Sequence, residues 1–171
     1  MNYLWAPWRI AYILGPKSDD CVFCLGTDCS EDEKRLVLHR GQYCFVILNR
    51  FPYNSGHLMI CPYRHVSLLE SLAGPELLEM MELAQLSSVI LKNAFKCEGI
   101  NMGLNQGQAA GAGIRDHLHF HLVPRWNGDS SFIAVLDDVR TIPAYLEKTY
   151  IQLLPYFQRS ASQPYQRPDI L

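Results

Sequence analysis

The chain has 171 residues, of which 49% are hydrophobic and 19% charged, and its formal net charge is −2. This size and apolar content suit one globular domain with a sizeable core, and the lack of a basic excess argues against a nucleic-acid polymer as partner. No apolar run approaches the ~20 residues of a membrane span and the start lacks a signal-peptide pattern, so we expect a cytoplasmic protein with no membrane partner.

The pattern of the chain predicts three parts. These are an aromatic-rich extension at residues 1–20, one domain at 21–158 and a polar tail at 159–171. Within the domain, the order is strands, a helix, strands and a helix, with short connections between the central strands. This order favours an α+β fold with a mainly antiparallel sheet.

In the first half of the domain, aromatic and β-branched residues predict strands at 43–48 and 57–61, which we expect to form an antiparallel hairpin. Pro75 then opens a helix to about Lys96, with Gly99 as its end signal. Its predicted core-facing residues are Met80, Leu83, Ala84, Ser87, Leu91, Ala94 and Phe95. The spacing of Glu76, Glu79 and Glu82 predicts a solvated helix face, and His39 is expected at the surface.

The second half contains a Gly/Ala/Gln loop at 106–113 and a polar tail after the last predicted helix. The remaining predicted elements are strands at 100–105, 117–123 and 132–136, and a helix at 141–157.

Cys21 and Cys24 form a Cys-x-x-Cys pair. In a cytoplasmic chain this spacing favours metal binding or redox chemistry over a structural disulfide. Cys44 and Cys61 lie in apolar runs, where they are expected to be small buried hydrophobic residues.

The most informative segment is the predicted strand at 117–123. Because alternate residues of a strand share a face, His117, His119 and His121 are expected on one side. Neighbouring imidazoles require a ligand, a metal or fixed hydrogen bonds. Two interpretations follow: the three histidines bind one metal ion, or one of them is a nucleophile that the others support. The core-facing residues between and after them are Leu118, Phe120 and Leu122.

The loop before this strand helps to choose between them. Gly107, Gly111 and Gly113 allow a ligand to approach the backbone, and successive N–H groups can form an anion-binding nest. Next to three histidines, such a loop favours a phosphate whose phosphorus atom faces an imidazole.

The segment His117-Leu-His-Phe-His-Leu-Val123 resembles the motif of the histidine-triad (HIT) superfamily, and the resemblance extends over about residues 21–135. The stretches at 4–9 and 126–132 are most similar to the bacterial diadenosine tetraphosphate (Ap4A) phosphorylase branch. Other segments that resemble the family in the same order are Leu48-Asn-Arg50, Gly56-His-Leu-Met-Ile60, Pro62-Tyr-Arg-His-Val66 and Asn105-x-Gly107.

The resemblance implies a HIT-like fold with a five-stranded sheet, a long helix and a C-terminal helix, and it implies a homodimer. It also implies a nucleotidyl hydrolase or transferase that acts on the α-phosphate of a nucleotide or dinucleoside polyphosphate. His119 would be the nucleophile that forms a nucleotidyl-histidine, and a backbone carbonyl near His117 would fix its tautomer. His121 would contact the phosphate and assist the leaving group, and His57 would complete the histidine cluster.

For nucleotide binding, the resemblance implies that Asn49 contacts the ribose and that Asn105 helps to hold the phosphate. The backbone of Gly111, Ala112 and Gly113 would share that phosphate. Many relatives carry Ser or Thr where this chain has Gly113. The missing hydroxyl leaves the choice between hydrolysis and phosphorolysis open.

Some family members build a structural zinc site from the Cys-x-x-Cys pair and two histidines. The matching residues here are Cys21, Cys24, His65 and His117, so the resemblance implies a structural zinc. No organic cofactor is expected. The alternatives are a metal-dependent hydrolase that uses the three triad histidines as catalytic ligands, and a nucleotide-binding module without turnover.

Overall fold

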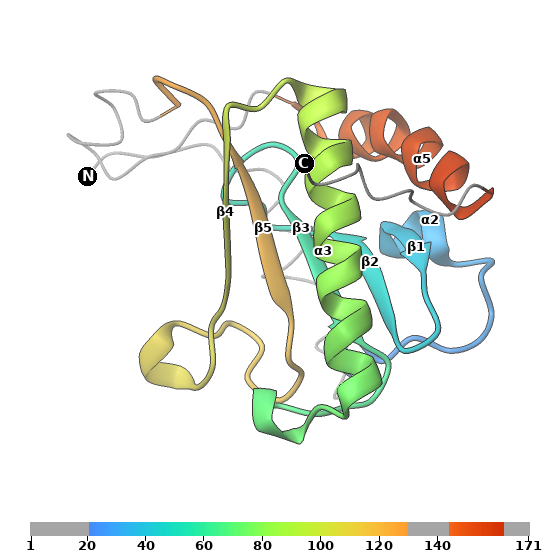
Figure 1. Ribbon diagram of the computed structural model, residues 1–171, viewed down its shortest axis with the longest axis vertical. Helices are drawn as coiled ribbons and strands as arrows, with labels where there is room; N and C mark the ends of the chain where they lie inside the picture. The colour runs from blue at the N-terminus through green and yellow to red at the C-terminus, as the bar shows by residue number, and fades with distance from the viewer. Residues whose placement is uncertain (1–20, 130–143, 163–171) are drawn as a thin grey trace, which may run out of the picture.

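The computed structural model describes residues 21–129 and 144–162, which form one antiparallel sheet with helices against one face (Figure 1). Each pair of neighbouring strands is antiparallel, in the order β1-β2-β3-β5-β4. The predicted α+β fold with a five-stranded antiparallel sheet is therefore confirmed. None of the described helices is both long and apolar enough to cross a membrane. The strands are β1 (Val37–Arg40), β2 (Cys44–Leu48), β3 (Leu58–Pro62), β4 (Gly99–Leu104) and β5 (Phe120–Arg125).

Two long helices, α3 (Gly74–Phe95) and α5 (Leu146–Ser162), share one core with the strands. The predicted inward positions of α3 are confirmed, since the central ones are buried and Ala94 and Phe95 pack against the core. Lys96 ends α3 in a left-handed conformation with φ 52°. The prediction that Gly99 ends this helix is therefore wrong, because Gly99 is the first residue of β4. The short helices are α2 (Asp32–Arg35), η1 (Leu69–Ser71) and η2 (Gln108–Ala110).

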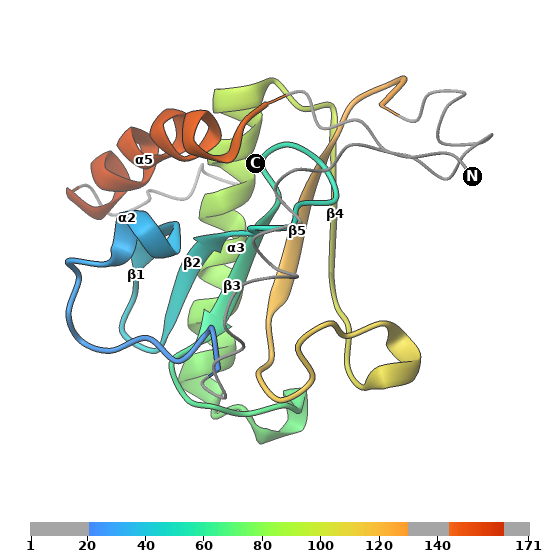
Figure 2. The same cartoon turned by 180° about the vertical axis from the view of Figure 1, so that it is seen from behind.

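The opposite face of the sheet carries a second apolar layer, and the chain that leads into α2 crosses this face (Figure 2). The period of two in β2 divides its side chains between the faces, because Cys44 lies in the helix-side core and Phe45 in the second layer. Cys44 and Cys61 are both buried, as predicted. The buried residues of this second layer are Phe23, Val37, Phe45, Ile47, Met59 and Cys61.

The predicted strand at 117–123 begins three residues later than expected, at Phe120. The reason lies in Pro62 at the end of the neighbouring β3: proline has no N–H to donate, and its carbonyl accepts the side chain of His117 at 2.8 Å. The backbone ladder of β3 and β5 therefore ends at the pair Ile60–Phe120. The alternation of side chains nevertheless continues, because Leu118 lies in the helix-side core.

Other boundaries also differ from the predictions. β1 was not predicted, and α5 runs from Leu146 to Ser162 rather than over 141–157. The predicted strand at 132–136 and the extension at 1–20 lie outside the described residues.

The predicted solvated face of α3 is wrong for two of its three glutamates. Glu76 is buried, pairs with Arg64 at 2.6 Å and accepts the N–H of Ala73 at the start of the helix. Glu79 accepts three backbone N–H groups from residues 42–44, at 2.6–2.7 Å. These carboxylates attach α3 to the sheet. His39 is also not a surface residue, because it is half-buried against Phe157.

Candidate active site

The histidines come from two neighbouring strands on the face opposite the helices. His57 directly precedes β3, and His121 lies in β5, opposite Met59 in the register. Gly56 positions His57 by a tight turn: its φ is 78°, and a Cβ atom there would lie 2.9 Å from the ring of Phe95. Only glycine combines this conformation with such a close approach.

Hydrogen bonds fix which nitrogen of His57 carries the proton. Its Nδ1 accepts the backbone N–H of Tyr53 at 3.0 Å and faces the side-chain amide of Asn49 at 3.2 Å. Because Nδ1 is an acceptor, the proton of the neutral ring is on Nε2, which lies 2.9 Å from Nδ1 of His121. His57 therefore donates to His121.

The same argument then applies to His121. Its Nδ1 is the acceptor, so its own proton is on Nε2. This Nε2 is buried and has no hydrogen-bond partner among the described residues. A buried donor without a partner is costly, by about 1–3 kcal/mol, and such an orphan is expected where a ligand supplies the acceptor.

His119 has the opposite polarity. Its Nδ1 donates to the carbonyl of His117 at 2.8 Å, so in the neutral ring the lone pair is on Nε2. The ring is 7% exposed and stands beside His121, with ring centroids 4.7 Å apart. The site thus pairs a nucleophilic nitrogen with a hydrogen-bond donor.

Burial keeps these rings neutral near pH 7. Burial first, and the neighbouring histidines second, lower the pKa of His57 to about 3 and that of His121 to about 4. Burial also lowers the pKa of His119, against the raising effect of its bond to the carbonyl of His117. A neutral imidazole is the form that can attack an electrophile.

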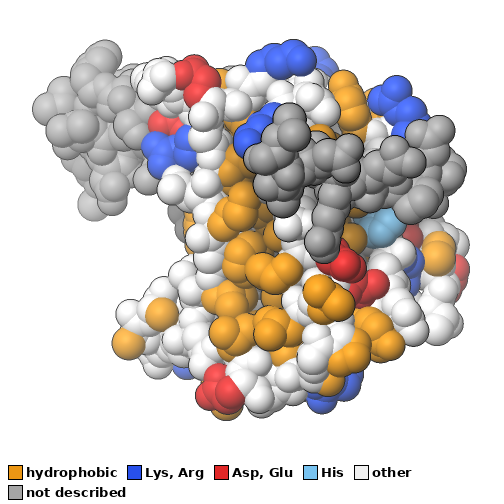
Figure 3. Space-filling model, viewed as in Figure 1, with side chains coloured by type: hydrophobic (Ala, Val, Ile, Leu, Met, Phe, Trp, Pro, Cys, Tyr) orange, Lys and Arg blue, Asp and Glu red, His pale blue; other side chains and the backbone are white. Residues whose placement is uncertain are grey.

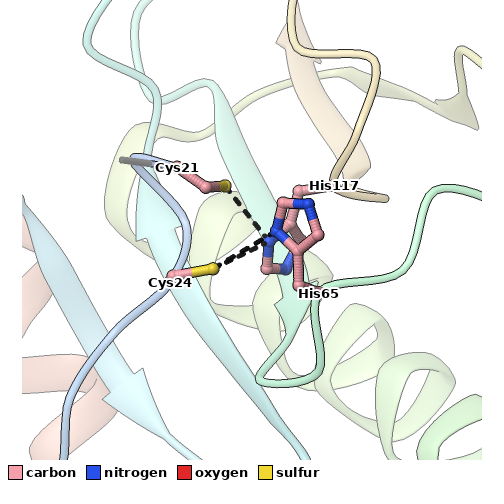
Figure 4. A group of neighbouring side chains, drawn as sticks. All are labelled: Cys21, Cys24, His65 and His117. Carbon is pink, nitrogen blue, oxygen red and sulfur yellow. Dashed lines mark hydrogen bonds between the residues drawn. The ribbon is translucent and has the colours of Figure 1, made fainter. Parts of the chain in front are cut away.

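A second cluster lies where the Cys-x-x-Cys turn meets the segments after β3 and before β5. Figure 4 shows the sulfur atoms of Cys21 and Cys24 directed at the rings of His65 and His117. One ligand atom from each residue lies within 4.8 Å of the others. Cys21 Sγ and Cys24 Sγ are 3.3 and 3.8 Å from Nδ1 of His117, and Cys24 Sγ is 3.3 Å from Nδ1 of His65.

These distances fit a metal ion. Tetrahedral zinc with sulfur and nitrogen ligands separates its ligand atoms by roughly 3.3–3.8 Å. His117 donates its Nε2 proton to Pro62, which leaves Nδ1 bare toward the sulfurs. A metal-binding histidine commonly donates its other N–H to a carbonyl in this way. Among the described residues, no such group of ligand atoms forms from the three triad histidines.

Among the predicted nucleotide-binding residues, Asn49 lies beside His57, and some groups of these residues are already engaged. The Asn49 oxygen accepts the N–H of Phe51 at 2.9 Å. Asn105 follows β4, whose last residue pairs with Phe120 beside His119. In the loop, the N–H groups of Gly111 and Ala112 donate to carbonyls of the same loop. These two groups would have to exchange partners to reach a phosphate.

Three contributors to the site were not predicted. They are the N–H of Tyr53 that sets His57, the Pro62 carbonyl that sets His117, and the ring of Phe23, which packs on His119 with centroids 5.0 Å apart. Two of these are backbone groups, which carry no signal in the residue type. Phe23 does stand between the two cysteines, and that position was the available signal.

Comparison with known proteins identifies the same region. The model of the HIT domain matches residues 30–128. The chain is 40% identical over 157 residues to an AP-4-A phosphorylase of Mycobacterium tuberculosis, and the alignment covers 87% of this chain and 80% of that protein. It is 25% identical over 135 residues to a bis(5'-adenosyl)-triphosphatase of Dictyostelium discoideum, covering 75% and 90%. A Zn-bound histidine triad family protein from Mycobacterium smegmatis superposes with a TM-score of 0.60 at 25% identity, covering 74% and 86%.

Proposed function

Because this chain belongs to the HIT domain family, we propose that it is an enzyme that cleaves nucleotides or dinucleoside polyphosphates at the α-phosphate. The similar proteins named for AP-4-A phosphorylase and bis(5'-adenosyl)-triphosphatase activity support this substrate class. The observation that carries the mechanism is the opposite protonation of two neighbouring Nε2 atoms. Nε2 of His119 carries a lone pair, and Nε2 of His121 carries a proton that has no acceptor among the described residues.

In the proposed first step, Nε2 of His119 attacks the α-phosphorus, and the bond from phosphorus to the leaving phosphate oxygen breaks. A nucleotidyl-histidine forms, and its ring keeps the Nδ1 proton. The ring then carries positive charge, which strengthens its hydrogen bond to the His117 carbonyl. The N–H of His121 stabilises the charge that develops on the phosphate oxygens.

In the second step an acceptor attacks the same phosphorus and releases His119. Water as acceptor gives hydrolysis, and inorganic phosphate gives phosphorolysis. Two displacements of lower barrier replace one difficult displacement. The identity of 40% with an AP-4-A phosphorylase favours phosphate as the acceptor.

For substrate binding, we infer that Asn105 and the loop at 111–113 border the phosphate, as the resemblance implies. A ribose contact by Asn49 is compatible with its place beside His57 if the amide changes partner. Glycine at 113 provides no hydroxyl, so the backbone carries more of the phosphate contact.

The product test uses Ap4A with and without inorganic phosphate. ADP plus ATP, formed only with phosphate, is the expected result. AMP plus ATP without phosphate would indicate hydrolysis at the α-phosphate instead. Two ADP without phosphate would indicate cleavage at the centre of the phosphate chain and would contradict attack at the α-phosphate. No product from Ap4A or from shorter dinucleoside polyphosphates contradicts the proposal and favours a binding module. Loss of activity within seconds of adding a chelator favours a catalytic metal.

We also propose that Cys21, Cys24, His65 and His117 bind a structural zinc. The spacing of their ligand atoms supports this, as does the Zn-bound relative. A bound zinc would join the turn at Cys21–Cys24 to the segment that carries the triad. It would thus stabilise the fold without entering the reaction.

Loss of one ligand should remove zinc and stability together. We expect Cys24→Ser and His65→Ala to lose stoichiometric zinc and to lower Tm by about 10 °C. Elemental analysis and calorimetry measure the two effects. The matched control is Cys29→Ser, because Cys29 is exposed and outside the cluster. Retention of zinc by both ligand variants contradicts this site.

A homodimer is supported by an apolar band over α3 and the adjoining β4, which Figure 3 shows on one face. β4 is an edge strand among the described strands, and a second copy can extend the sheet there across a two-fold axis. The exposed apolar residues on these two elements are Leu77, Leu78, Met81, Val89 and Met102.

A charge within this band should separate the dimer. Met102→Asp is expected to shift the mass in sedimentation toward the monomer. Ile151→Asp on the exposed face of α5 is the control and should not change the mass. A wild-type protein that stays monomeric at high concentration refutes the dimer.

A further inference from the structure

Phe23 connects the cysteine turn to the candidate nucleophile. The residue lies between Cys21 and Cys24 and is only 3% exposed. Its ring is tilted against His119 at 5.0 Å between centroids and meets the edge of His117 at 5.6 Å. The ring of His119 therefore has Phe23 on one side and His121 on another.

The backbone of the turn holds Phe23 in this place. The N–H of Cys24 donates to the carbonyl of Cys21 at 3.1 Å, so the two cysteines enclose a short turn with Phe23 inside it. Arg35 donates to the carbonyl of Cys24 at 3.3 Å from the exposed side. The direction of the Phe23 ring thus depends on where the two sulfur atoms are held.

His117 makes a second connection to the same nucleophile. Its Nδ1 faces the sulfur atoms of the cluster, while its backbone carbonyl accepts the Nδ1 proton of His119 at 2.8 Å. One contact orients the His119 ring by packing and the other by a hydrogen bond. The hydrogen bond comes from His117, which is a member of the cluster of ligand atoms. The packing contact comes from Phe23, which stands between the two cysteines of that cluster in the sequence.

We propose that Phe23 is a positioning residue and that metal bound by the cluster orients the nucleophile by holding the Phe23 ring against His119. The proposal rests on the proposed function for its catalytic consequence only, because the orientation of His119 can be measured without substrate. The metal does not take part in the reaction. It limits the rotamers available to His119, which attacks only when its Nε2 faces the phosphorus.

The test compares two equal truncations in the same apolar layer, Phe23→Leu and Phe45→Leu. Both residues are buried in the layer opposite the helices, but the Phe45 ring packs on Tyr63, at 5.3 Å. Leucine keeps most of the apolar volume, so both variants should fold. Both are measured in saturating Zn²⁺ with the zinc content verified, which separates the role of the ring from loss of the ion.

Two measurements decide the outcome. The long-range ¹H–¹⁵N spectrum of the His119 ring reports its tautomer and surroundings, and steady-state kinetics separate kcat from KM. Phe23→Leu is expected to change the His119 signals and to lower kcat roughly ten-fold or more, with KM little changed. Phe45→Leu should leave both unchanged. Chelation of the wild-type protein should change the same His119 signals, and added Zn²⁺ should restore them.

Unchanged His119 signals in Phe23→Leu, or an increase in KM alone, overturn the proposal. Equal effects of the two variants overturn it as well, since they indicate general core packing. So do His119 signals that do not respond to chelation while zinc is lost. If the wild-type protein turns over no nucleotide, the proposed function fails, and the spectra still decide whether the cluster orients His119.

Discussion

Replacing His119 by glycine is expected to lower the kcat for Ap4A by about 10⁴-fold or more, because the variant has no nucleophile to form the covalent intermediate. The space left by the ring should then accept free imidazole, which is expected to restore part of the turnover. Product formation with and without imidazole measures both effects. The nucleotidyl adduct should appear in the intact mass of the wild-type protein and be absent from the variant.

The control for this variant is His39→Ala. His39 packs on Phe157, on the helix side of the sheet and away from the triad, so kcat should stay within about two-fold of wild type. Turnover by the glycine variant at the native rate would refute a histidine nucleophile at this position. An adduct that maps to another histidine would reassign the role.

The stability of the fold is expected to fall steeply on mild acidification. Burial lowers the pKa of His57 to about 3 and that of His121 to about 4, whereas an unfolded histidine titrates near 6.5. Below pH 6.5 the unfolded state therefore binds more protons than the folded state, and stability decreases as the pH falls toward these values. Each histidine contributes about 1.4 kcal/mol per pH unit in this window.

From pH 6.5 to pH 5, the two histidines together should lower the free energy of unfolding by about 3 kcal/mol, because the full slope is reached only well below pH 6.5. Urea unfolding at a series of pH values measures this slope. In His57→Gln one of these titrating groups is gone, so the slope should be less steep than in the wild-type protein. A free energy that does not change between pH 7 and pH 5 would contradict the assignment of these rings as buried and neutral.

Much of the fold could be predicted because its local signals agree with its packing. The helix from Pro75 and the hairpin of β2 and β3 have clear periodicities, and both were found. β1 was missed because its four residues include His39 and Arg40, which resemble a polar loop. Its strand conformation comes from pairing with β2, and no local pattern records that contact.

The sequence predicted which side chains form the histidine cluster, but it did not predict most of the backbone groups that form hydrogen bonds with them. The strand pattern and the resemblance identified the histidines, but the tautomers of His57, His117 and His119 depend on backbone groups of Tyr53, Pro62 and His117. The glutamates of α3 failed for a related reason. A spacing of three predicts a solvated face, yet Glu79 meets the turn before β2, a contact that only the folded chain brings about.

The alternation of the histidine segment limits how this region can evolve. His117, His119 and His121 share a face because a strand repeats every two residues, and a different role is proposed for each. Deletion or insertion of a single residue between them would turn part of the set into the apolar interior and bring leucine or phenylalanine onto the face that carries the histidines. Substitution of one apolar residue for another at positions 118, 120 or 122 keeps this spacing and the shared face of the histidines. A designed protein that is to present these three histidines on one face must therefore keep the spacing of the heptapeptide at 117–123 unchanged.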